Sequence, residues 1–157
     1  MSILLALFLA TAFPSTSRTA WMRPESFHLA IGMSREETVK RLSENGWPPK
    51  KGGTADEMLV DYSDTKSMTL KFSRNRLHAI RFEFFAMPAE AHDAFDEQKS
   101  FLKTAFGAPK SVKVPSVLIY DNRLPNVMVV LNENARSTNG IDGLGMLVVS
   151  YYDPAAK

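Results

Sequence analysis

Histidine is the residue type from which catalysis or metal binding is most readily expected in this sequence. The chain has three histidines, His28, His78 and His92, and no two of them stand at a spacing typical of metal ligands. We interpret His78 as a histidine at the edge of the core, because it shares one face of a predicted strand with Ile80 and Phe82. We interpret His92 as part of the solvated first turn of a helix. The histidines therefore indicate no metal site and no catalytic site.

Motifs for nucleophilic, nucleotide and calcium chemistry are also missing from the sequence. No Gly-x-Ser-x-Gly surrounds a serine, and no Gly-Lys-Ser/Thr of a phosphate-binding loop occurs. Gly143-Leu144-Gly145 is not followed by the third glycine of a dinucleotide-binding loop. The polar segment 132–143 lacks the Asp-x-Asp-x-Asp-Gly register of a calcium loop. We therefore predict that the protein is not an enzyme and has no metal or cofactor.

Composition and charge narrow the class of protein further. A chain of 157 residues, 45% of them apolar, is long enough to form one domain with a substantial core. Its formal net charge of +2 is too small to predict a nucleic-acid partner. Because the chain has no cysteine, disulfides, thiolate metal ligands and a cysteine-linked lipid anchor are excluded.

The amino terminus predicts export. Residues 3–13 form an uncharged apolar run that is too short for a membrane-spanning helix, which needs about 20 residues, and is typical of a signal peptide. Cleavage after Ala12 follows a small-x-small pattern, and cleavage after Ala20 is the alternative. We assign residues 1–20 to a signal peptide and leader, and we expect a periplasmic or secreted protein without a transmembrane anchor. The other interpretation is a buried first strand or helix of a cytosolic protein.

The segment 31–42 predicts a short helix with its start signal in place. Ser34 can accept a hydrogen bond from a first-turn amide while Glu37 reaches back to the Ser34 amide, as in a capping box. Val39 and Leu42 would share the buried face. Gly46 would end the helix. We interpret residues 14–26 as an aperiodic leader, residues 27–31 as extended chain, and residues 50–55 as a flexible connection.

Alternating apolar residues predict three strands after this helix, over 58–62, 68–72 and 77–85. Asn75 tolerates a positive φ, so the third strand should return antiparallel to the second. Proline at the start and glycine at the end predict a longer helix over 88–106. Further strands are expected over 117–120, 126–131 and 144–152, with the loop 132–143 between the last two.

The order of elements is therefore helix and three strands, twice. We predict an α+β fold with a single domain over residues 21–157, made of two tandem αβββ units at about 27–86 and 87–153. Each helix has one apolar stripe and each group of strands one apolar face, so two such units can form one antiparallel sheet with both helices packed on one face.

The first unit resembles a known small module. The residues that carry the resemblance are Ile31-Gly32-Met33-Ser34, Glu36-Glu37, Val39, Leu42 and the hairpin Phe72-x-x-x-x-Leu77-x-x-Ile80. Residues 27–85 resemble the helix-then-strands unit of the β-lactamase-inhibitor-protein-like superfamily, which includes the small lipoprotein subunit of the outer-membrane β-barrel assembly machine. The resemblance implies an exported protein that binds another protein through an exposed sheet face and loops. The lipid anchor of that subunit and the disulfides of the inhibitor have no counterpart in this cysteine-free chain.

We therefore expect a non-catalytic module that binds another protein, in the cell envelope, through the sheet face and loops. The predicted contact residues on the open face are Lys71, Arg81, Glu83 and Phe85, because charged and aromatic side chains together are typical of interfaces. Trp47 is a further predicted contact residue, because it lies in the loop after the first helix and tryptophan is enriched in interface hot spots; the alternative is that it packs on the end of that helix. The alternative is a small ligand-binding protein or hydrolase with a pocket between the sheet and the loop 132–143. A third possibility is a purely structural component of the envelope.

Overall fold

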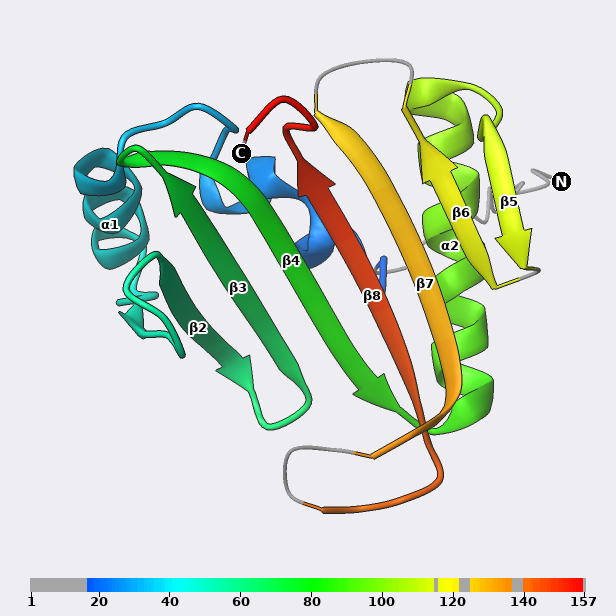
Figure 1. The fold of residues 1–157 in the computed structure, drawn as a ribbon. Helices are drawn as coiled ribbons and strands as arrows, with labels where there is room; N and C mark the ends of the chain where they lie inside the picture. The colour runs from blue at the N-terminus through cyan, green and yellow to red at the C-terminus, as the bar shows by residue number, and fades with distance from the viewer. Residues whose placement is uncertain (1–16, 115, 122–124, 137–139, 157) are drawn as a thin grey trace, which may run out of the picture.

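The computed structural model describes residues 17–114, 116–121, 125–136 and 140–156, and the apolar run 3–13 lies outside them. The protein is a mixed α+β fold built on one antiparallel sheet of eight strands, in the order β1-β2-β3-β4-β8-β7-β6-β5 (Figure 1). Two α-helices and two short 3₁₀ turns accompany the sheet. In chain order the elements are η1 Ala20–Met22, η2 Pro24–Phe27, α1 Arg35–Glu44, β1 Lys50–Lys51, β2 Glu57–Ser63, β3 Lys66–Ser73, β4 Arg76–Ala86, α2 Pro88–Phe106, β5 Ser111–Val114, β6 Val117–Tyr120, β7 Asn126–Ala135 and β8 Leu144–Tyr152.

The six predicted strands are confirmed, and the structure adds two more. β1 comes from the segment interpreted as a flexible connection, and it pairs with β2 at one edge of the sheet. β5 pairs with β6 at the other edge. β7 continues to Ala135, so the first four residues of the predicted loop 132–143 are strand. Edge strands depend on the neighbour that they pair with, which explains why their own sequences did not predict them.

A two-residue turn joins β3 to β4 as predicted. Arg74 and Asn75 both have positive φ values, 49° and 62°, which is the conformation of the turns that suit twisted hairpins. The strands pair antiparallel, with Leu70 opposite Ile80 and Met68 opposite Phe82. A register shift lies between Lys71 and Phe72. The turn and this shift together set which side chains of β4 face the core, since Leu77 and Ile80 on either side of the shift are both buried.

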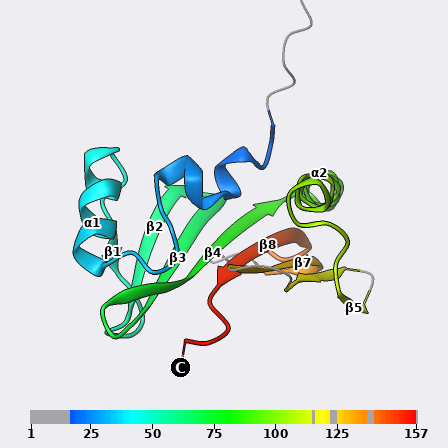
Figure 2. The same cartoon turned by 90° about the horizontal axis from the view of Figure 1, so that it is seen from above.

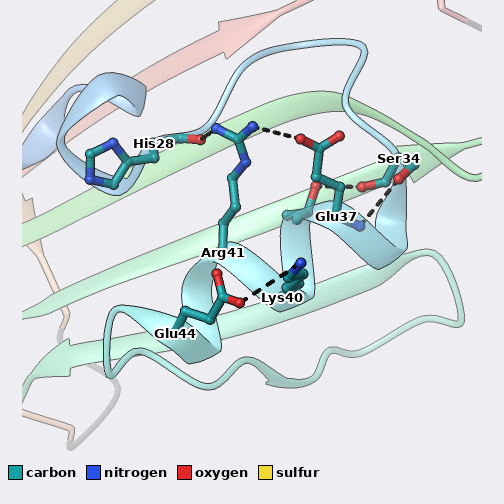
Figure 3. A network of polar contacts seen from close by, with 7 residues as sticks. His28, Ser34, Glu37, Lys40, Arg41 and Glu44 are labelled. Atoms are coloured by element: carbon teal, nitrogen blue, oxygen red, sulfur yellow. Dashed lines mark hydrogen bonds and ion pairs between the residues drawn. The ribbon is translucent and has the colours of Figure 1, made fainter.

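Helix α1 begins at the predicted cap, but only half of the capping box forms (Figure 3). The Ser34 hydroxyl accepts a hydrogen bond from the Glu37 amide at 3.1 Å. The Glu37 carboxylate accepts from Arg41 at 2.6 Å, where we had predicted a bond to the Ser34 amide. Thr38 and Leu42 are fully buried, and Val39 only half, so the buried face is rotated by one residue from the prediction.

The segment before α1 corrects the prediction most strongly. Residues 20–27 were expected to be leader and extended chain, yet they form η1 and η2, and His28 follows in a left-handed conformation with φ 56°. Trp21 stacks on Tyr62 with ring centroids 5.5 Å apart, and Phe27 packs on Phe82 at 5.9 Å. These turns fill the space over β2, β3 and β4 because their aromatic side chains reach the sheet core.

Glu97 of α2 holds the residues that precede η1. Its carboxylate accepts hydrogen bonds from the hydroxyl of Ser17, from the amide of Arg18 at 3.1 Å, and from the amide and hydroxyl of Thr19 at 3.3 and 2.8 Å. Gln98, also on α2, donates to the Thr19 carbonyl at 3.1 Å. Because Thr19 is fully buried, residues 17–19 belong to the folded domain.

Helix α2 lies along β7 and β8 and confirms the predicted helix 88–106. Its buried side chains include Ala94, Phe95 and Leu102. The packing is so close that a Cβ at Gly145 of β8 would lie 2.5 Å from the Cβ of Ala91. Figure 2 shows η1, η2 and α2 on one side of the sheet, which we call the inner side. Within the described residues, every helix is too short or too polar to cross a membrane.

Candidate protein-binding surface

The outer side of the sheet can be read directly from the strand pairing. Residues directly opposite each other on neighbouring strands share a face, and alternate residues along a strand do so as well. One outer row runs across β2, β3, β4, β8, β7 and β6 through Leu59, Thr69, Arg81, Ser150, Met128 and Ile119. The next row runs through Asp61, Ser67, Glu83, Val148, Val130 and Val117. The second row changes from polar to apolar side chains beyond β4, and the first row, which begins with Leu59, does so beyond Ser150 of β8.

The outer side therefore has an apolar half over β6, β7 and β8. Phe85 of β4 adjoins it, since it pairs with Met146 of β8. Val148 is 5% exposed and Phe85 8%, and the other members are half-buried. We call this set the outer apolar patch: Phe85, Val117, Ile119, Met128, Val130, Met146 and Val148.

The other half of the outer side is polar and carries two ion pairs. Lys71 lies 3.0 Å from the carboxylate of Glu57, and Arg81 lies 2.7 Å from that of Glu83. Partly exposed pairs of this kind contribute little to folding stability, about 0–1 kcal/mol each. They place both signs of charge beside the outer apolar patch.

Four of the five predicted contact residues lie on this side, and the fifth does not. Lys71, Arg81 and Glu83 are in the polar half, and Phe85 is on the same side but buried. Trp47 was predicted to be a contact residue, but it stacks on Tyr62 at 4.5 Å and packs against Phe27 at 6.4 Å, within the aromatic cluster of the inner side. Trp47 therefore packs on the inner side of the sheet, whereas the other four residues lie on the outer side.

Sequence reasoning missed most of the outer apolar patch. Segments such as Val117–Tyr120 are apolar at every position, so alternation does not say which residues face inward. The signal that was present is the continuous apolar run itself, which is typical of strands covered on both faces.

A shallow cavity of about 470 Å³ lies on the polar half of the outer side. Thr69 of β3 and Glu83 and Phe85 of β4 line it, together with the β2–β3 turn around Asp64. The turn and the sheet are joined here by a hydrogen bond of 2.8 Å from the Phe85 amide to the Thr65 carbonyl. The outer side thus offers both a polar depression and an apolar surface to a partner.

The alternative function, a ligand-binding protein or hydrolase, requires a pocket between the sheet and the loop 132–143. The cavity that comes nearest to this description lies beside β7. It measures about 590 Å³ and is lined by His92 and Phe95 of α2 and by Ser116 and Glu133, among others. His92 Nδ1 is 3.7 Å from Glu133 Oε1, beyond the distance at which a catalytic base is oriented, and the side chain of His92 is 56% exposed. These residue types can perform hydrolysis, but their geometry here does not favour it.

The remaining histidines lie apart from this cavity. His78 is half-buried beside the register shift of β4, and its carbonyl accepts from the Asp153 amide at 2.8 Å. His28 is exposed at the end of η2. Within the described residues, no three His, Asp or Glu side chains are grouped as metal ligands would be.

Comparison with protein-family models, with curated proteins and with solved structures finds no match to this chain.

Proposed function

We propose that this chain is an exported, non-catalytic protein-binding module that acts through the outer side of its sheet. The observation that carries this proposal is the outer apolar patch, which lies on the side of the sheet opposite α2 and the 3₁₀ turns. Apolar surface gathered on one face favours association, because a partner removes it from water.

The partner that fits this surface is another protein, which we place in the cell envelope. The outer apolar patch would form the centre of the interface, and Lys71, Arg81 and Glu83 its charged rim, an arrangement common in protein interfaces. Rim charges mainly affect the association rate and the choice of partner, whereas the buried centre contributes most of the affinity.

Export would require cleavage that leaves the folded domain intact. Cleavage after Ala20 would remove Ser17, Arg18 and Thr19, which are bound to Glu97 of α2. Cleavage after Ala12 would keep them. We therefore propose Ala12 as the cleavage position and the periplasm, or the medium, as the compartment.

We also propose that the fold consists of two tandem units with both helices on the same side of the sheet. The order of elements supports this proposal, since each α-helix is followed by four strands, the first of them a short edge strand. Each set of four strands is a meander, and the two meanders meet where β4 pairs with β8. The units would then be αββββ, one strand longer than the predicted αβββ.

The test of the proposed function is capture of a partner from native envelope extracts by the mature protein, followed by reconstitution with the purified partner. The double variant M128K/V130K places two charges in the outer apolar patch and should abolish binding. The control S100K places a charge on an exposed position of α2 and should bind normally. Equal binding by both variants would contradict the proposal.

The alternative function rests on the cavity that contains His92 and Glu133. If the protein were a hydrolase using this cavity, it would cleave activated esters, and His92→Ala would lose that activity. We expect no hydrolysis above that of a denatured control, and turnover that depends on His92 would replace our proposal.

A further inference from the structure

A small cavity of about 320 Å³ lies at the end of the sheet where β4 begins and β8 ends. Figure 1 shows the start of β4 and the C-terminal segment at this same end. The cavity is lined by Gly32, by residues 73–74 and 76–78, and by residues 153 and 155–156, and we call it the end cavity. It shares no residue with the outer apolar patch, so it is independent of the proposed protein-binding surface.

Three side chains of the end cavity are basic, namely Arg74, Arg76 and His78. Among the described residues, neither arginine forms an ion pair with a carboxylate. The guanidinium of Arg76 donates a hydrogen bond of 3.1 Å to the carbonyl of Gly32, which also lines the cavity. Two positive charges therefore stand at the cavity without a neutralising partner.

Asp153 is the one acidic residue in the lining of the end cavity. Its carboxylate accepts a hydrogen bond of 2.9 Å from the Ala155 amide, within the turn that follows β8. Two arginines against one aspartate leave the lining with a charge of +1 when His78 is neutral, and protonation of His78 increases it. The electrostatically complementary ligand is therefore an anion.

Arg74 has a backbone conformation that is uncommon for its residue type. Its φ value is 49°, in the left-handed region that Asn, Asp and Gly adopt readily and that long side chains rarely adopt. The first position of this hairpin turn also favours Asn, Asp or Gly. The geometry of the turn therefore does not explain the arginine, whereas a use for its charge beside the cavity does.

His78 reaches the end cavity from a β-bulge. Its neighbours Leu77 and Ala79 are opposite Phe72 and Lys71, which are adjacent on β3, so His78 is the extra residue of β4 at this point. Bulges are frequent beside functional sites, where they redirect a side chain. The positive-φ turn and the bulge thus bring two of the basic residues to one cavity.

The size and composition of the end cavity favour a small polar ligand. Its volume is at the lower end of the range of ligand sites, roughly 300–1,000 Å³. The only large apolar residue in its lining is Leu77, which is fully buried in the core. Guanidinium groups present several N–H donors in a plane, an arrangement that matches the oxygens of a phosphate group.

We propose that the end cavity binds a phosphate group, with the guanidinium groups of Arg74 and Arg76 as charged donors and the imidazole of His78 as a further donor. This site is an addition to the proposed protein-binding function and does not depend on it. Soluble phosphate and the headgroup of an anionic phospholipid present the same charged oxygens, and the experiment separates these two sources.

The first measurement follows amide chemical shifts of the full chain in nuclear magnetic resonance during titration with inorganic phosphate at neutral pH. We expect saturable shifts at residues 73–78 and 153–156, and no saturable shifts with chloride at the same ionic strength. The second measurement is sedimentation with vesicles of phosphatidylcholine alone or mixed with phosphatidylglycerol. Sedimentation with the mixed vesicles only, reversed by inorganic phosphate, would identify a lipid headgroup as the source. Saturable shifts without sedimentation would identify a soluble phosphate.

Two variants and one control test the residues. Arg74→Asn suits the left-handed conformation and keeps the turn, yet it should weaken phosphate binding about tenfold, because it removes a charged hydrogen bond. Arg76→Gln should weaken binding by a similar factor. Lys40→Gln is the control, since it removes the same charge from an exposed position of α1 and should bind phosphate normally.

Three results would overturn the proposal. The first is the absence of saturable shifts at the end cavity with phosphate. The second is an equal response to chloride, which would indicate screening of charge and no site. The third is equal phosphate affinity of Arg74→Asn and Lys40→Gln, which would show that these arginines are not special among the cations of the chain. The amide spectrum of each variant also reports its folding, so weakened binding by a folded Arg74→Asn protein can be assigned to the lost guanidinium.

Discussion

Replacing Glu97 with glutamine should destabilise the protein by detaching residues 17–19 from α2. The carboxylate of Glu97 accepts four hydrogen bonds, from the Ser17 hydroxyl, the Arg18 amide, and the amide and hydroxyl of Thr19. Hydrogen bonds to a charged group contribute about 1.5–3 kcal/mol each when they are buried. Because Glu97 is partly exposed and glutamine keeps one acceptor oxygen, we expect a total loss of about 1–2 kcal/mol.

The dependence on pH follows from the pKa of Glu97. Desolvation alone would raise this pKa, but the hydrogen bonds from Ser17, Thr19 and Arg18 outweigh it, so the pKa in the folded protein is lower than its ordinary value of 4.5. A carboxyl group with a lowered folded pKa stabilises the protein at pH values above the unfolded pKa, and this stabilisation is lost as the pH falls through the folded pKa. The difference between wild type and Glu97→Gln should therefore shrink in acid.

Urea unfolding measured by tryptophan fluorescence tests both expectations, because Trp21 lies two residues after Thr19. With a urea slope of about 2 kcal/mol per molar, Glu97→Gln should lower the midpoint by roughly 0.5–1 M at about pH 7. Asp93→Asn is the control, since its ion pair with Arg18 is exposed and should change stability by less than about 1 kcal/mol. An unchanged midpoint for Glu97→Gln, or a loss of stability that is the same at all pH values, would refute this reasoning.

Three further substitutions test the packing. Gly145→Ala should destabilise the protein by about 1–3 kcal/mol, because its Cβ would lie 2.5 Å from that of Ala91, whereas Gly53→Ala, which has space, should change the urea midpoint little. Trp47→Ala should lower the free energy of unfolding by about 2–3 kcal/mol through the lost stacking on Tyr62, while capture of the partner stays unchanged. Tyr151→Phe should leave the urea midpoint unchanged or raise it, since it removes a buried hydroxyl without a partner, and a lowered midpoint would show that this hydroxyl is bonded in the protein.

Local chemistry explains the parts of the fold that the sequence predicted well. Asn75 and its neighbour Arg74 determine a hairpin turn because few conformations join two strands in two residues. Helix α2 begins at Pro88 and is followed by Gly107. Each of these residues starts or ends the helix through the conformation of its own backbone. Such features depend on residues adjacent in the chain and can be recognised without knowing the fold.

The features that were missed depend on contacts between distant segments. The 3₁₀ turns have no amphipathic period, and Trp21 is buried only because Tyr62 and Phe82 lie beneath it. Trp47 was placed on the binding surface because it lies in a loop, yet it packs inside the same aromatic cluster. The cavity of about 550 Å³ lined by Leu29, Phe106 and Tyr151, among others, joins residues far apart in the sequence, so no local pattern could have predicted it.

The most direct test of the proposed function is photo-crosslinking in the living cell from single positions on the two sides of the sheet. A benzophenone side chain at Met128 lies in the outer apolar patch, and one at Ser100 lies on the exposed side of α2. We predict a discrete adduct with one envelope protein from Met128 and none from Ser100. No adduct from Met128, or the same adduct from both positions, would contradict the claim that the outer side of the sheet binds a partner.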